Sequence, residues 1–126
     1  MRFKGDPLEI TYGHYDNDKI HITYGTCKLS YNNFPDELRY SNIDLPWAMF
    51  TNTIKVKTYC KHDDSYDPVI GERVVRKKIM KNYMSIVRQL CDYYAKEASR
   101  KLDEVKTIRN DVDRCNKSII EYLKTI

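Results

Sequence analysis

The sequence predicts an α+β fold in which a small antiparallel β-meander packs on a long C-terminal helix. Two observations support this fold class. Residues 1–66 contain short segments in which apolar and polar residues alternate, separated by Gly, Asn and Asp. Residues 67–126 repeat apolar side chains at helical spacing and contain no Gly or Pro after Gly71. We therefore expect one structural domain, formed by a β-rich part, 1–66, and a helical part, 67–126.

The first predicted strands lie in residues 8–31. Residues 8–12 alternate apolar and polar side chains, and residues 13–18 include the Gly, Asn and Asp that favour a chain reversal. Residues 19–24 alternate again and are expected to pair with the first strand. Gly25 allows a turn or bulge before residues 26–31 resume the alternation. The segment therefore predicts a meander of two or three strands.

The apolar side chains of residues 32–47 have no regular period. We expect a loop with one short helical turn after Pro35, whose aromatic residues pack onto the sheet. Residues 49–51 are expected to lead, in extended form, into residues 53–60. There β-branched residues alternate with lysine and tyrosine, which makes 53–60 the clearest strand of the chain.

The long helix has a definite predicted start. Asp67 suits the N-cap position because its side chain can accept a hydrogen bond from a free backbone N–H group. Pro68 suits the first helical position, where its missing N–H removes no hydrogen bond. Farther along, apolar residues recur in alternating steps of four and three, with Lys101 as the one polar interruption, and this is the heptad seam of a coiled coil. The seam consists of Met80, Met84, Val87, Cys91, Tyr94, Ala98, Val105, Ile108, Val112, Cys115, Ile119, Tyr122 and Ile126.

The two parts of this helix have different expected partners. Up to Tyr94, apolar residues also lie outside the seam, so this part is expected to pack on the sheet. Beyond Ala98 the apolar set narrows to the seam, which needs a second helix to cover it. A continuous helix would dimerise through residues 98–126, whereas a break near 98–103 or 110–111 would give a helical hairpin; the absence of Gly and Pro favours the continuous helix. The association residues are Val105, Ile108, Val112, Cys115, Ile119 and Tyr122.

The formal net charge of +4 is unevenly distributed. Residues 1–66 carry eight Lys and Arg against nine Asp and Glu, whereas residues 67–126 carry fourteen against nine. A basic run early in the helix predicts a surface that binds nucleic acid directly or covers an acidic protein groove. The alternative is a solvated helix face that only keeps the protein soluble. The residues of the predicted surface are Arg73, Arg76, Lys77, Lys81 and Arg88.

Eleven tyrosines are more than a core of this size can use. Tyrosine is favoured at protein interfaces because its ring gives rigid contact area while its hydroxyl remains polar. We therefore expect the tyrosines, Trp47 and the basic helix face to form a contact surface.

Sequence features also indicate the compartment. No apolar run approaches the roughly 18 residues of a membrane span, and residues 1–7 lack the apolar core of a secretory signal. We therefore expect a cytoplasmic protein without membrane contact. The four cysteines are widely scattered, which favours free thiols over a disulfide framework.

The most ligand-like cluster is Cys60, His62, Asp63 and Asp64, with Asp67 nearby. Zinc sites usually contain paired ligands such as C-x-x-C, and no second pair exists here. We interpret the cluster as a polar connector from strand to helix and expect no metal and no cofactor. Nucleophilic-serine and phosphate-loop motifs are absent too, so we expect no catalytic residues and no enzyme.

Residues 56–71 resemble a stretch of small accessory proteins from bacteriophages and prophages of Gram-positive bacteria. In those proteins a strand ends in a Cys-His-Pro-Asp-Asp-like turn, followed by Phe-Asp and a Gly-containing, basic helix start. Lys61 departs from this pattern, and the Pro after the His is absent. The positions that match in kind are Cys60, His62, Asp63, Asp64, Tyr66, Asp67 and Gly71.

The resemblance covers about 25 residues and implies a phage origin rather than an activity. Short phage proteins without enzyme motifs often bind host machinery, including as anti-CRISPR or other anti-defence inhibitors. We therefore expect a non-enzymatic interaction protein, a homodimer in the host cytoplasm, that inhibits a host nucleic-acid-handling enzyme such as a CRISPR nuclease. The alternatives are a basic phage protein that binds DNA or RNA itself and a coiled-coil scaffolding component.

Overall fold

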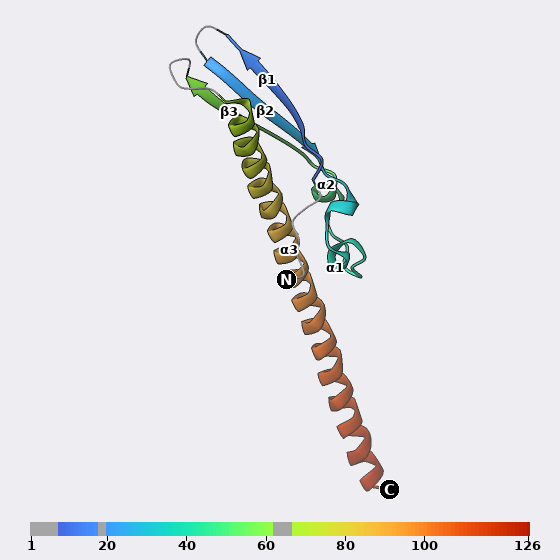
Figure 1. The fold of residues 1–126 in the computed structure, drawn as a ribbon. Helices are drawn as coiled ribbons and strands as arrows, with labels where there is room; N and C mark the ends of the chain where they lie inside the picture. Colours follow the sequence, from blue (N-terminus) through green and yellow to red (C-terminus); the bar gives the residue numbers. More distant parts are fainter. Residues whose placement is uncertain (1–7, 18–19, 62–66) are drawn as a thin grey trace.

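A computed structural model describes residues 8–17, 20–61 and 67–126, with only the backbone at 60 and 61. Its elements form a three-stranded antiparallel sheet and one long helix, as predicted for the α+β class (Figure 1). In chain order they are β1 (Thr11–Asp16), β2 (Ile20–Lys28), the 3-10 turn η1 (Tyr31–Asn33), α1 (Asp36–Arg39), α2 (Trp47–Phe50), β3 (Thr53–Lys61) and α3 (Pro68–Lys124).

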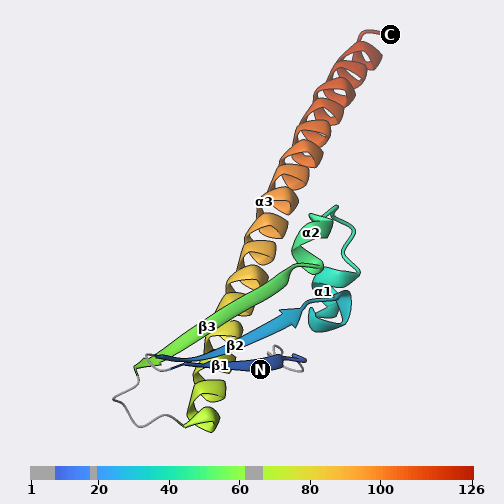
Figure 2. The ribbon, with the colours of Figure 1, turned by 90° about the horizontal axis from the view of Figure 1, so that it is seen from above.

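The sheet has the order β1-β2-β3, and α3 crosses one of its faces diagonally (Figure 2). Residues of the central strand alternate between the two faces, as the strand period requires. Thr23, Gly25 and Cys27 are buried against α3, whereas Tyr24 and Lys28 are exposed on the opposite face. One face of the sheet therefore belongs to the core, and the other is open.

The first predicted turn is in the wrong place. β1 begins at Thr11 and runs to Asp16, so Gly13 lies inside a strand, opposite Tyr24 of β2. A Cβ atom at Gly13 would overlap Cζ, Cε2 and Oη of Tyr24, so the tyrosine ring occupies the space of the missing side chain. This ring explains why a glycine, which usually weakens a strand, is compatible with one here.

Gly25 also lies inside a strand, so the predicted turn or bulge there is wrong. β2 continues through it to Lys28, with Gly25 opposite Val56 of β3. A Cβ atom at Gly25 would overlap Cγ1 of Val75 on α3, and one at Gly71 would overlap Oγ1 of Thr23. The two glycines therefore allow the backbones of helix and sheet to approach closely.

The core lies between the sheet and the first part of α3. The buried helix residues repeat mostly every four positions, which keeps them on one face. They are Gly71, Val75, Ile79, Tyr83, Val87 and Leu90. The prediction that this part of the helix packs on the sheet through apolar residues outside the seam is confirmed, since only Val87 belongs to the seam.

Residues 31–50 close one end of this core with an aromatic cluster. The Phe34 ring lies 5.8 Å from that of Tyr83 and 5.0 Å from that of Phe50, and Phe50 stacks on Tyr31 at 4.7 Å between centroids. The Tyr83 hydroxyl also donates to the carbonyl oxygen of Asn33. The predicted helical turn after Pro35 is confirmed as α1, whereas the predicted extension at 49–51 is wrong because Met49 and Phe50 are helical.

The start of α3 is as predicted, with Asp67 Oδ1 accepting from the N–H of Val69 at 2.9 Å and Pro68 as the first helical residue. The helix then continues without a break for 57 residues, so the hairpin alternative is wrong. From Ser99 onward all of its residues are exposed, and this part extends away from the sheet (Figures 1 and 2).

Candidate interaction surfaces

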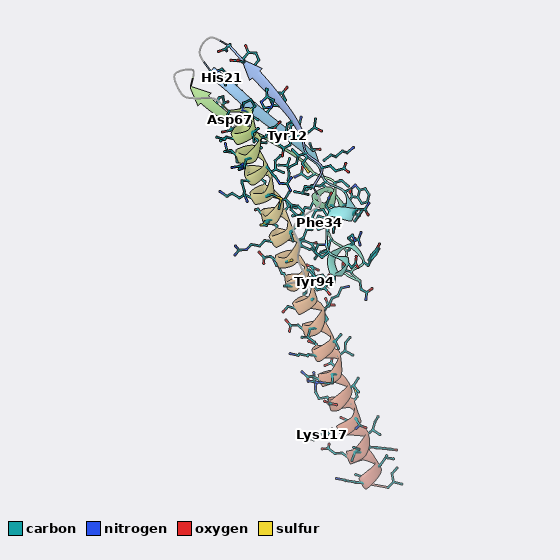
Figure 3. All side chains as sticks on the ribbon, viewed as in Figure 1. Tyr12, His21, Phe34, Asp67, Tyr94 and Lys117 are labelled. Atoms are coloured by element: carbon teal, nitrogen blue, oxygen red, sulfur yellow. The ribbon has the colours of Figure 1, made fainter. Side chains whose placement is uncertain are left out.

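The first candidate surface is the distal helix, which we define as residues 98–126. All of its residues from Ser99 onward are exposed, and Figure 3 shows Lys117 on a helix with no other described element beside it. The predicted association residues lie here, and their exposure is high for apolar side chains: 61% for Val105, 62% for Ile108 and 57% for Ile119. These side chains form an uncovered apolar stripe, which is typical of an interface.

The second candidate is the predicted basic face of α3. Arg73, Lys77, Lys81 and Arg88 are exposed, and they point away from the sheet, opposite the buried stripe. Arg76 is only half-buried and lies at the edge between helix and sheet. The structure therefore brings four of the five predicted residues onto one solvent-facing surface.

The third candidate surface is the outer sheet face, which sequence reasoning missed. Tyr15, Tyr24 and Tyr59 are 53%, 47% and 57% exposed there, and Lys55 and Lys57 lie beside them on β3. The Lys57 ammonium lies 5.5 Å from the centre of the Tyr59 ring. A hydrogen bond to Tyr59 raises the pKa of Lys57 above its ordinary value.

Among the side chains that the structure describes, the strands carry no acidic residue on the outer sheet face. The register sets Tyr15 opposite Ile22 and Ile22 opposite Tyr59, and it sets Tyr24 opposite Lys57. The outward positions of β1, β2 and β3 for which the structure describes a side chain include no Asp and no Glu. Aromatic and cationic groups therefore form one continuous surface. The lysine and tyrosine alternation in 53–60 was a signal for it, but only the strand register brings Tyr15 and Tyr24 alongside.

A chain of three polar side chains links the sheet to the helix. His14 Nε2 lies 3.1 Å from Glu72 Oε1, and Thr23 Oγ1 lies 3.3 Å from His14 Nδ1. A hydroxyl, an imidazole and a carboxylate in this order resemble a catalytic relay. Thr23 is completely buried beneath Gly71, however, so its hydroxyl cannot reach a substrate. The chain instead fixes the start of α3 on β1 and β2.

The predicted polar connector lies mostly outside the described residues, because His62, Asp63 and Asp64 are not among them. Within the described part of the chain, no group of three or more His, Cys, Asp or Glu is arranged to hold a metal ion. Cys27, Cys91 and Cys115 are free thiols, in line with the sequence. Burial, together with nearby Glu9, raises the pKa of the Cys27 thiol.

The tyrosines do not form a single contact surface with Trp47 and the basic helix face. Tyr83 is in the core, and Trp47 lies on α2 with its ring 5.0 Å from that of Tyr31. The tyrosines of the outer sheet face lie on the opposite side of the sheet from α3 and its basic residues. Any partner that contacts both must wrap around the molecule, so we treat these surfaces as separate.

No family model matches this chain, and neither a curated protein nor a solved structure shows a match to it. Among the described residues, no helix combines the length and the apolar character needed to cross a bilayer.

Proposed function

We propose that this protein is a non-enzymatic interaction module that forms a parallel homodimer through its distal helix. Each copy then presents a head, formed by the sheet, residues 31–50 and the first part of α3, to a partner. The observation that carries the proposal is the exposed heptad stripe of residues 98–126. Every residue of α3 from Ser99 to Lys124 is exposed, so 26 residues, roughly 39 Å of helix, have no covering element in the described part of the chain. An apolar stripe on a lone helix gains little stability, whereas a second copy buries it.

The charged residues beside the stripe favour a second copy in parallel orientation. With Val105 and Val112 at a positions, Glu104 occupies a g position and Arg109 the following e position. In a parallel coiled coil, g of one helix faces the next e of its partner, so Glu104 would pair with Arg109 on both sides. An antiparallel pair would instead place acidic g positions near one another.

Ion pairs within the distal helix orient Glu104. Arg100 Nη1 lies 2.6 Å from Glu104 Oε1, and Arg100 Nη2 lies 3.0 Å from Glu97 Oε2. Both carboxylates lie at g positions, so Arg100 holds them along the border of the stripe. This arrangement is compatible with a pair of helices that meet along the stripe.

The proposal is tested by the molar mass in solution of the double variant Ile108→Asp/Ile119→Asp. We expect the wild type to have the mass of a dimer and the variant that of a monomer, because two buried charges per helix are costly. Thr107→Asp/Ile120→Asp is the matched control, since it adds the same charges at c and b positions outside the seam. A monomeric wild type, or loss of the dimer in both variants, would contradict the proposal.

Orientation is tested separately by oxidation of Cys115. This residue occupies a d position, so a parallel pair in register places the two Cys115 thiols opposite each other, within reach of a disulfide. We expect mild oxidation to give a covalent dimer on a non-reducing gel that disappears in Cys115→Ser. Cys91→Ser is the control, and a covalent dimer that depends on Cys91 instead would place the interface nearer the head.

We further propose that the dimer acts in the cytoplasm of a bacterial host, where its heads bind a host protein that handles nucleic acid. The exposed basic face of α3 supports an acidic partner groove. The role as a phage inhibitor of a defence nuclease stays a prediction from the resemblance at residues 56–71. Affinity capture with the wild type and with Arg73→Glu/Lys77→Glu/Lys81→Glu tests it, and capture of the same host proteins by both would contradict it.

A further inference from the structure

We infer that the outer sheet face binds a single-stranded polynucleotide, with bases stacked on the tyrosines and phosphates paired with the lysines. This goes beyond the proposed dimer and uses a different surface. Tyr15, Tyr24 and Tyr59 are each about half exposed on a sheet for which the structure describes three strands. Tyr24 has a structural role over Gly13, but an open sheet that buries one face on a helix has no such need for the rings of Tyr15 and Tyr59 on the other.

The orientation of Tyr24 suits it to stacking. Three atoms of its hydroxyl end would all overlap a Cβ atom at Gly13, so one side of the ring lies over the β1 backbone. The other side faces solvent, since the residue is 47% exposed. Glycine at position 13 therefore lets the ring lie along the sheet, where a base can stack on it, rather than stand upright.

The three rings lie within reach of neighbouring nucleotides. Tyr15 and Tyr59 occupy the two outer strands on either side of Ile22, so their backbone positions are about 10 Å apart. Tyr24 lies two residues farther along the central strand, about 7 Å from that row. Open sheets that recognise single-stranded RNA stack two or three bases on aromatic residues at such positions.

The charge of the surface identifies the partner as an anion. Lys55 and Lys57 lie on β3 beside the tyrosine rows, and a shallow hollow between them and Tyr24 is lined also by Gly25, Thr26 and Val56. No acidic side chain competes for these lysines at the described outward positions of the strands. Lysine contacts to phosphate combined with aromatic stacking are the general mode of binding single strands without sequence preference.

A duplex fits these observations less well. Base faces are inaccessible in a duplex, so tyrosine rings cannot stack on them without unpairing. An acidic polypeptide such as polyglutamate would pair with the lysines but has no planar rings to stack on the tyrosines. We therefore expect preference for single strands over both.

The test measures fluorescence anisotropy of labelled twelve-residue oligothymidine and oligouridine with the full chain. We expect binding that weakens with salt, and a dissociation constant about 5- to 150-fold higher for each tyrosine replaced in Tyr15→Ala and Tyr59→Ala. Lys55→Gln/Lys57→Gln should reduce the slope of log K against log salt by about 1.4, because each phosphate contact on a single strand contributes about 0.7. Tyr15 and Tyr59 lie outside the core, and thermal unfolding verifies that their variants are folded.

Matched controls locate the binding surface. Tyr40→Ala removes a tyrosine that is 75% exposed elsewhere, and Lys117→Gln/Lys124→Gln removes the same charge from the distal helix. Both should bind like the wild type. No binding at low salt, equal affinity for a duplex or for polyglutamate, or a loss confined to Arg73→Glu/Lys77→Glu/Lys81→Glu would overturn the inference.

Discussion

The two halves of α3 show that similar apolar residues have different roles when their spacing differs. The proximal half, residues 68–90, repeats its buried residues mostly in steps of four, and Ile79 there is fully buried. The distal helix repeats its apolar residues in alternating steps of three and four, and Ile108 is 62% exposed. Only the second spacing is that of a coiled-coil seam, which begins at Met80 beside the buried stripe and continues through the distal helix.

The comparison also shows which residues decide whether a helix face is covered within the chain. The proximal half has Gly71, and the sheet opposite it has Gly25, so backbones approach and side chains such as Val75 fit between them. The distal helix has no glycine and meets no sheet. Its stripe is apolar and uncovered, and in the proposed parallel dimer a second copy would complement the charges that border it.

The largest expected effect on stability comes from replacing an isoleucine by alanine in the proximal half. The same replacement in the distal helix provides the comparison. Ile79→Ala should lower the free energy of unfolding of the head by about 2–5 kcal/mol, because it leaves a cavity in a packed core. Ile108→Ala should leave the head unchanged at protein concentrations too low for association. Urea unfolding followed by tyrosine fluorescence measures both.

Concentration dependence separates the two effects. The loss in Ile79→Ala should be the same at every protein concentration, whereas any effect of Ile108→Ala should appear only as association sets in. Equal destabilisation by both variants in dilute solution would show that the distal stripe is covered within one chain.

A smaller effect is expected where helix and sheet approach. Gly25→Ala places a methyl group against Val75 Cγ1 and should cost about 1–3 kcal/mol of unfolding free energy through overpacking. The distal control is Ser99→Ala, which should change the stability little, since Ser99 is exposed. Thermal unfolding of both variants provides the comparison.

A second substitution tests the cause. In the background Val75→Ala, which removes Cγ1, the cost of Gly25→Ala should fall, and the difference is the coupling energy between the two positions. An unchanged cost would assign the effect of Gly25→Ala to the strand rather than to helix packing.

The sequence predicted features that depend on neighbouring residues, such as the start of a helix, better than contacts between residues distant in the chain. The start of α3 follows from Asp67 and Pro68, and its continuity from the absence of Gly and Pro, because these signals act within a few residues. Gly13 and Gly25 were interpreted as turns because glycine is usually a sign of one. The residues that make them strand positions, Tyr24 and Val75, are distant in sequence or on another element.

The candidate surfaces follow the same rule. The seam and the basic face of α3 were predictable, because helical periodicity alone determines which residues share a face. The outer sheet face was not, because Tyr15, Tyr24 and Tyr59 come from three strands. Only the strand register places these tyrosines on one surface. The predicted turn at residues 13–18 also assigned Tyr15 to a turn, whereas it lies in β1.

The smallest expected effect tests the orientation of the distal helices through Glu104 and Arg109. In a parallel dimer, Glu104→Arg places like charges together on both sides and should weaken dimerisation by about 2- to 30-fold. Glu104→Arg/Arg109→Glu should recover most of that loss, because it restores opposite charges across the interface. Sedimentation equilibrium at low salt measures the dissociation constants.

Whether Glu104→Arg weakens or tightens the dimer discriminates between parallel and antiparallel helices. Both variants lose the contact between Arg100 and Glu104, so their comparison isolates the pairing with Arg109. In an antiparallel dimer the acidic g positions would lie near one another, and Glu104→Arg would relieve repulsion and tighten the dimer. Tighter association in the single variant would therefore contradict the parallel arrangement, while high salt should reduce either effect because the charges are exposed.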